Sequence, residues 1–163
     1  MEVGDEKNGT PPGSDARGAD RGERGGVGGL HPVPQRDPQG NTGTCWGTQE
    51  ADVIIGTSQK DYIDGQRGAD LIRAGRGADH ILGDDYWLGE DENHGGPGAD
   101  HIVGNYDSEK HFGGRGDDLL VDEKSDEEPD VFRCGPGYDS VYYNKGLDKV
   151  ADDCEELIPS FSG

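Results

Sequence analysis

Acidic side chains recur at a fixed interval in this 163-residue chain, and they are the residues best placed to do chemistry. The first four acids are nine residues apart, at Asp52, Asp61, Asp70 and Asp79. After a jump of twelve the series continues through Asp91, Asp100, Glu109 and Asp118, and after a second jump of twelve through Asp130, Asp139 and Asp148. Carboxylate oxygens are the ligands that hard divalent cations prefer, so the series predicts cation binding at repeated sites.

The residue two places after most of these acids is apolar, which indicates the elements that position the carboxylates. The apolar residues are Ile54, Ile63, Ile72, Ile81, Ile102, Leu120, Phe132, Val141 and Val150, and the pattern fails at Asn93 and His111. Each period supplies a Gly-rich turn of six residues and then a three-residue strand whose middle side chain points to one face. Two turns and two strands make a coil of 18 residues, and successive coils stack as parallel sheets.

The best rows read GQRGAD at 65–70, GGPGAD at 95–100 and GGRGDD at 113–118. They resemble the G-G-x-G-x-D-x-U-x nonapeptides of RTX (haemolysin-type) calcium-binding proteins. The resemblance covers roughly residues 47–150. It implies an all-β fold, the parallel β-roll, which is a right-handed β-solenoid of about 18-residue coils.

The resemblance also implies the ligands of Ca²⁺, which sits between loops one coil apart and takes Asp carboxylates and glycine-loop carbonyls. Because stacking loops are two rows apart, the acids fall on two edges of the roll. The first edge carries Asp61, Asp79, Asp100, Asp118 and Asp139, and the second edge carries Asp52, Asp70, Asp91, Glu109, Asp130 and Asp148. The implied ligand residues are Asp79, Asp100, Asp118, Asp139, Asp70, Asp61, Gly75, Gly77, Gly96, Gly98, Gly114, Gly116, Gly135 and Gly137, for three to four ions.

The two edges are not equally well formed. On the first edge four consecutive loops keep both the fourth-position glycine and the aspartate, whereas on the second edge only the Asp70 loop is regular. Both three-residue insertions fall on the second edge, and Asn93 and His111 belong to its strands. The lead rows replace the second glycine with Thr48 and Thr57 and lack the fourth-position glycine, which argues against calcium there.

Composition indicates that the cations are structural. Only 29% of residues are hydrophobic, 30 are glycine and the formal net charge is -20, values close to those of disordered chains. From Cys45 onward there are 28 acidic and 10 basic residues. This charge disfavours nucleic acid and anionic membranes as partners, and we expect the repeat to be disordered without Ca²⁺.

We expect three segments: a disordered Gly/Pro-rich arm at 1–44, the roll with a C-terminal cap at 45–157, and a tail at 158–163. The sequence contains no apolar run typical of a signal peptide or a membrane span. The resemblance nevertheless implies an extracellular protein, because RTX-type proteins are exported.

Cys134 and Cys154 are expected to lie on adjacent coils, within disulfide reach, at the C-terminal end of the roll. A bond between them would close that end, and two free thiols are the alternative. Cys45 lies about five coils away and is expected to be unpaired.

The predicted function is a calcium-binding repeat module of a secreted protein. The alternatives are a fragment of a larger RTX exoprotein (toxin, protease or lipase) and a surface-adhesion β-roll. The outward pair His80 and His101 is a conceivable Zn²⁺ site, but it lacks a third ligand and is read as solvated surface. No nucleophile–base constellation is present, so an enzyme is not expected, and neither a small-molecule substrate nor a protein partner is inferred.

Overall fold

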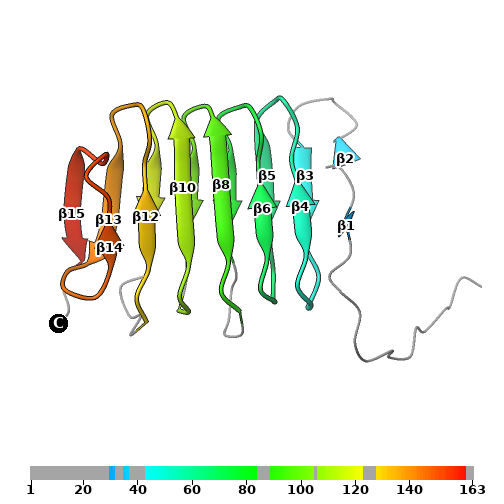
Figure 1. The fold of residues 1–163 in the computed structure, drawn as a ribbon. Helices are drawn as coiled ribbons and strands as arrows, with labels where there is room; N and C mark the ends of the chain where they lie inside the picture. The colour runs from blue at the N-terminus through cyan, green and yellow to red at the C-terminus, as the bar shows by residue number, and fades with distance from the viewer. Residues whose placement is uncertain are drawn as a thin grey trace, which may run out of the picture.

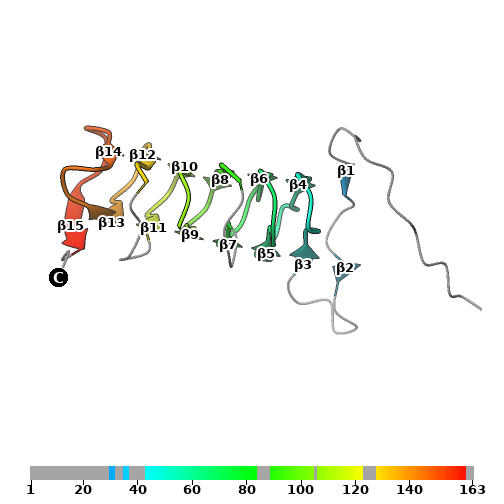
Figure 2. The ribbon, with the colours of Figure 1, turned by 90° about the horizontal axis from the view of Figure 1, so that it is seen from below.

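The computed structural model describes residues 30–31, 35–36, 43–83, 89–104, 106–122 and 128–160. Within these ranges the chain forms only strands, turns and bends, and the strands build two facing parallel sheets (Figure 1). When the molecule is seen from below, the chain passes back and forth between the two layers through loops (Figure 2). Each full coil adds one strand to each sheet. The predicted all-β solenoid is therefore confirmed.

The seven-stranded sheet contains β1 (Leu30–His31), β4 (Val53–Ile55), β6 (Leu71–Arg73), β8 (Glu92–Pro97), β10 (Lys110–Arg115), β12 (Val131–Arg133) and β14 (Lys149–Val150). The eight-stranded sheet contains β2 (Gln35–Arg36), β3 (Gly43–Trp46), β5 (Asp61–Asp64), β7 (His80–Leu82), β9 (His101–Val103), β11 (Leu119–Val121), β13 (Ser140–Asn144) and β15 (Glu156–Ser160). All neighbouring pairs are parallel except β2 with β3.

The strand register follows the spacing of the acids. Val53 pairs with Leu71, eighteen residues later, whereas Leu71 pairs with Glu92, twenty-one residues later. The second offset of twenty-one joins Lys110 to Val131. The three-residue insertions are therefore absorbed in loops without shifting the strands. Residues 84–88 and 123–127 of these loops lie outside the described residues.

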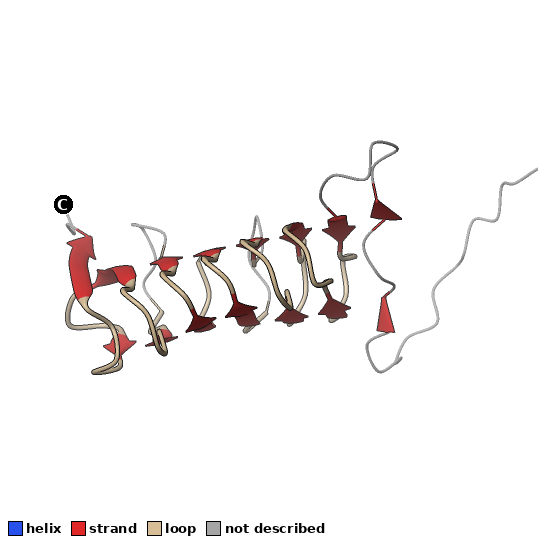
Figure 3. Cartoon of the chain, turned by 90° about the horizontal axis from the view of Figure 1, so that it is seen from above, coloured by secondary structure: helices blue, strands red, loops and turns tan. Residues whose placement is uncertain are grey.

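The two sheets face each other as two layers of strands (Figure 3). The core between them is a thin column of apolar side chains. The predicted inward residues at 54, 63, 72, 81, 102, 120, 132 and 141 are all at most 2% exposed, and Val150 is half-buried against them. Asn93 and His111 occupy the same column and are also fully buried. The period-two alternation of these short strands thus places ladder acids and core residues as expected.

Strands extend slightly beyond the segment predicted as the roll. β1 and β2 lie within the predicted arm and pair with β4 and β3, respectively. At the other end β15 continues to Ser160. The rest of the arm and residues 161–163 lie outside the described residues.

Candidate metal centres

Acidic residues of the first edge stack one coil apart, as the sequence predicts. The backbone N–H of Asp61 donates to Oδ1 of Asp79 at 2.7 Å, and the N–H of Asp79 donates to Oδ1 of Asp100 at 2.8 Å. The ladder continues from Asp100 to Asp118 at 2.8 Å and from Asp118 to Asp139 at 2.7 Å. One oxygen of each carboxylate is thereby fixed by the backbone of the preceding coil, which leaves the second oxygen for another partner.

The second oxygens of four first-edge carboxylates have no such partner. Oδ2 of Asp79, Asp100, Asp118 and Asp139 is buried and accepts no hydrogen bond from the described residues. A buried acceptor without a donor costs about 1–3 kcal/mol, and more when it is charged. These four carboxylate oxygens form one column, and each can coordinate a cation in place of accepting a hydrogen bond.

Electrostatics support the same reading. Burial raises the pKa of Asp79 to about 6 and that of Asp118 to about 7, and it also raises the pKa of Asp100 and Asp139. Neighbouring carboxylates add to the shift, because Asp100 and Asp61 face Asp79 along the ladder. Without a counter-charge the ionised column destabilises the folded state, and a divalent cation between coils reverses that effect.

Glycines bring the loop backbones of the first edge into close contact. A Cβ built on Gly98 would collide with the carbonyl oxygen of Gly77 in the preceding coil, and one on Gly116 would collide with that of Gly98. Positive φ values occur at Gly75, Gly77, Gly96, Gly114, Gly116 and Gly135. The same close approach to the preceding coil holds for Gly137. The structure thus places all eight predicted loop glycines against carbonyl oxygens of the neighbouring coil.

The lead row of this edge shows what the second oxygen does when a donor is available. Thr57 donates from its backbone N–H and its hydroxyl to Oδ2 of Asp61, at 2.6 and 2.8 Å. Thr48 makes the corresponding bonds to Asp52 on the second edge. The threonine rows therefore satisfy their carboxylates internally, whereas the glycine rows from Asp79 onward do not.

A carboxylate ladder also runs along the second edge. The N–H of Asp52 donates to Asp70, that of Asp70 to Asp91, that of Glu109 to Asp130, and that of Asp130 to Asp148, at 2.7–3.1 Å. Asp70 is therefore stacked between Asp52 and Asp91. The predicted sorting of the acids into two edges agrees with these hydrogen bonds.

Behind the second edge lies a polar cluster that was not predicted from the sequence. Glu109, His111 and Asp130 each offer a ligand atom within 4.8 Å of the others, and all three residues are buried. Burial lowers the pKa of His111 to about 3, so its imidazole is neutral. The ring stacks on Phe132 with centroids 5.1 Å apart. The sequence signal was an acid followed two residues later by a histidine in the apolar column.

A second acidic group adjoins this cluster. Asp122, Asp130 and Asp148 offer oxygens within 4.8 Å of one another. The side-chain amide of Asn144 donates to Asp122 at 2.7 Å, and its backbone N–H donates to Asp148 at 2.6 Å. Hydrogen bonds from Asn144 thus stabilise two of the three carboxylates, those of Asp122 and Asp148.

The outward histidines are half-buried and contact each other. His80 and His101 meet edge to face with ring centroids 4.6 Å apart, and burial lowers the pKa of both. Among the described residues no third His, Cys, Asp or Glu completes a metal-binding group with them. His94 stacks on Phe112 at 4.5 Å and contacts Glu92 at 2.7 Å.

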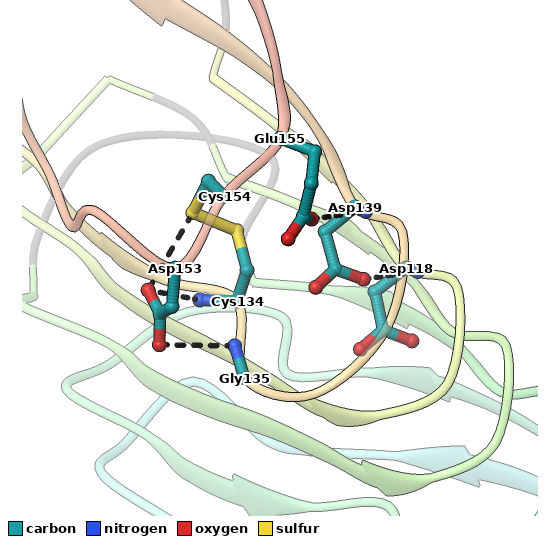
Figure 4. The surroundings of a disulfide bond; sticks show 7 residues. All are labelled: Asp118, Cys134, Gly135, Asp139, Asp153, Cys154 and Glu155. Atoms are coloured by element: carbon teal, nitrogen blue, oxygen red, sulfur yellow. Dashed lines mark hydrogen bonds between the residues drawn. A yellow bond between two sulfur atoms is a disulfide. The ribbon is translucent and has the colours of Figure 1, made fainter.

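The C-terminal end of the first edge is closed covalently. Cys134 and Cys154 form a disulfide with Cα atoms 5.2 Å apart, which confirms the predicted pairing (Figure 4). Cys45 is a buried free thiol. Asp153 accepts from the N–H groups of Cys134 and Gly135, at 3.4 and 3.2 Å. Asp153 therefore provides acceptors for backbone N–H groups of the last Gly-rich loop, which has no further Gly-rich coil beside it.

Glu155 extends the carboxylate ladder by one step beyond Asp139. Its Oε2 accepts the N–H of Asp139 at 2.9 Å, as the next aspartate does in earlier coils (Figure 4). The sequence did not reveal this role, because the offset between β13 and β15 is sixteen residues rather than eighteen.

Comparison with known proteins places the repeats in a family. A search of the curated proteins finds no significant match to the chain. The model of the RTX calcium-binding nonapeptide repeat matches residues 46–81 and 89–120 in four copies. The described residues include no helix that is long and apolar enough to cross a membrane. The loops within residues 46–81 and 89–120 therefore match RTX calcium-binding nonapeptide repeats.

Proposed function

We propose that the roll is a Ca²⁺-triggered folding module of an exported protein. The observation that carries the proposal is the column of four buried Oδ2 atoms on the first edge, none of which accepts a hydrogen bond from a described residue. RTX repeats bind Ca²⁺, and this column supplies carboxylate oxygens where the glycine loops stack. The family is typical of secreted proteins, which supports an extracellular location.

The proposal assigns three ions to the spaces between the four regular loops of the first edge. Each ion takes carboxylate oxygens from two successive aspartates among Asp79, Asp100, Asp118 and Asp139, together with carbonyl oxygens of the loop glycines. A fourth ion, held more weakly, is assigned to the Asp70 loop. Asp61 contributes least, because Thr57 already donates to its second oxygen. No residue is assigned a catalytic role.

Circular dichroism tests the folding step. We expect the chain in excess EGTA to give a coil spectrum and to gain sheet signal at roughly millimolar Ca²⁺, the range of extracellular calcium modules. Mg²⁺ at the same concentration is the control, because it demands a smaller octahedral site and should restore little structure. Full sheet signal in EGTA with no response to Ca²⁺ contradicts the proposal.

Surface binding is a second candidate, favoured by a row of rings on the outer face of the eight-stranded sheet. Trp46 and Tyr62 have ring centroids 6.4 Å apart, and Tyr62 stacks on His80 at 5.0 Å. Trp46 is 58% exposed. Loss of adhesion of the Ca²⁺-loaded protein to a cell surface on Trp46→Ala and Tyr62→Ala substitution would support this role, and unchanged adhesion would contradict it.

A third hypothesis is that the chain is part of a larger RTX exoprotein. The reading frame that surrounds the coding sequence decides it.

A further inference from the structure

An imidazole and two carboxylates converge behind the second edge, where most other coils carry apolar side chains and Asn93 is paired in register with His111. Glu109 precedes β10, His111 lies within β10, and Asp130 precedes β12, the neighbouring strand of the same sheet. One ligand atom of each lies within 4.8 Å of the others. We propose that Glu109, His111 and Asp130 form a binding site for a transition-metal dication of the Zn²⁺ class, separate from the Ca²⁺ sites of the first edge.

His111 supplies the evidence that this cluster is more than a group of acids. Its side chain is fully buried, and neither Nδ1 nor Nε2 has a hydrogen-bond partner among the described residues. Buried imidazoles in proteins normally donate or accept at least one hydrogen bond. Apolar residues fill the equivalent position in most other coils, so an unpartnered imidazole here needs a ligand that accepts a nitrogen lone pair.

The absence of a side chain at Gly104 leaves space beside Nε2 of His111 and Oε2 of Glu109. A Cβ built on Gly104 would lie 2.6 Å from Nε2 of His111 and 2.9 Å from Oε2 of Glu109. The side chain of any other residue at 104 would therefore fill the space next to both atoms. The φ angle of Gly104 lies outside the left-handed region, so backbone conformation alone does not require glycine here.

The ligand types select the metal class. Ca²⁺ takes six to eight oxygen ligands, whereas Zn²⁺ accepts imidazole nitrogen together with carboxylate oxygen at about 2.0–2.2 Å. Ligand atoms around one Zn²⁺ are then roughly 3–4 Å apart, so small side-chain rotations within the cluster suffice to close it. Asp130 keeps Oδ1 on the N–H of Glu109 at 2.8 Å, which fixes its carboxylate in place.

Metal titration of the full chain in saturating Ca²⁺ tests the proposal. Co²⁺ is the spectroscopic probe, followed by visible absorption, and Zn²⁺ is then added in competition. We expect one Co²⁺ per chain with nitrogen and oxygen ligation, displaced by one equivalent of Zn²⁺. Two variants address the site: His111→Phe, which keeps a ring against Phe132, and Gly104→Ala, which keeps every ligand but fills the space beside them. Each should weaken Co²⁺ binding at least tenfold.

The matched control is His80→Gln with His101→Gln, which removes the outward pair and should leave the Co²⁺ signal unchanged. Sheet content in Ca²⁺, followed by circular dichroism, reports whether each variant keeps the roll. Unchanged Co²⁺ affinity in folded His111→Phe, or in Gly104→Ala, overturns the proposal. Loss of the signal in the His80 and His101 variant also overturns it, because the metal would then be on the surface. Calcium-dependent folding is measured independently in the same samples, so failure here leaves the first-edge assignment standing.

Discussion

Both edges of the roll hold a ladder of carboxylates, but they offer a cation different surroundings. On the first edge four consecutive glycine loops lie against carbonyl oxygens of the neighbouring coil, and burial raises the pKa of Asp79, Asp100, Asp118 and Asp139. On the second edge two loops carry insertions, and Asn93 and His111 replace apolar core residues. The repeat length therefore sets the positions of the carboxylates, while the loop glycines and the inward residues set their surroundings.

The largest expected effect comes from breaking the close approach of loops on the first edge. Gly98→Ala places a methyl group against the Gly77 carbonyl, so the backbone of one coil must move. We expect a loss of about 3 kcal/mol in the free energy of unfolding, the upper range for overpacking, in Ca²⁺. Urea denaturation measures it.

Gly146→Ala is the control that separates backbone conformation from loop packing. Gly146 has positive φ, at 95°, and a Cβ there meets nothing within 4 Å, whereas the φ of Gly98 is not in the left-handed region and the cost there comes from packing. Its cost should be about 1 kcal/mol, from backbone conformation alone. Equal losses for the two variants would show that loop packing contributes nothing special on the first edge.

The disulfide should contribute nearly as much, at the C-terminal end of the same edge. Replacing Cys134 and Cys154 with serine removes a crosslink between residues twenty apart in sequence. Loop-closure entropy predicts a loss of about 3 kcal/mol in the free energy of unfolding. Urea denaturation of the double variant and of the reduced wild-type chain measures it. Identical midpoints for the oxidised and reduced chains would contradict a stabilising cap.

A smaller effect is expected from pH in the absence of calcium. Because burial raises the pKa of Asp79 to about 6 and that of Asp118 to about 7, the folded state binds more protons than the unfolded chain. Stability without Ca²⁺ should therefore be greatest below the ordinary carboxyl pKa and fall as pH rises from about 4 to 7.

Sheet content in EGTA, measured from pH 4 to pH 7.5, tests this dependence. Protons should partly replace calcium at the acid end of the range. A chain that gains sheet as the pH rises in EGTA would have the opposite sign and would contradict the account of the first edge. Saturating Ca²⁺ is the control, because the bound ions should flatten the dependence near neutral pH.

The sequence predicts most of this architecture because the period sets it directly. Ile63, Ile81 and Ile102 are buried in phase, and the ladder bonds of Asp79, Asp100 and Asp118 follow from stacking every second row. The Cys134–Cys154 bond was predictable for the same reason.

Features that break the period were not predictable. Glu155 joins the ladder through a shortened offset at β15, and Asp153 covers loop donors that only the last Gly-rich coil leaves exposed. The cluster of Glu109, His111 and Asp130 depends on which side chains of two neighbouring coils turn inward together. The periodic pattern assigns each of these residues to a repeat, but it does not identify the residue that it contacts.

The most direct test of the central claim compares Ca²⁺ titrations of Asp118→Asn and Asp130→Asn with the wild-type chain. Asparagine retains an oxygen that can accept the ladder N–H, so each variant removes charge with little change of shape. In the proposed arrangement Asp118 serves the ions above and below it. Its loss should raise the Ca²⁺ midpoint of folding roughly tenfold, equivalent to about 1.4 kcal/mol, whereas Asp130→Asn should shift it much less. Equal midpoints for the two variants would contradict the assignment of the calcium sites to the first edge.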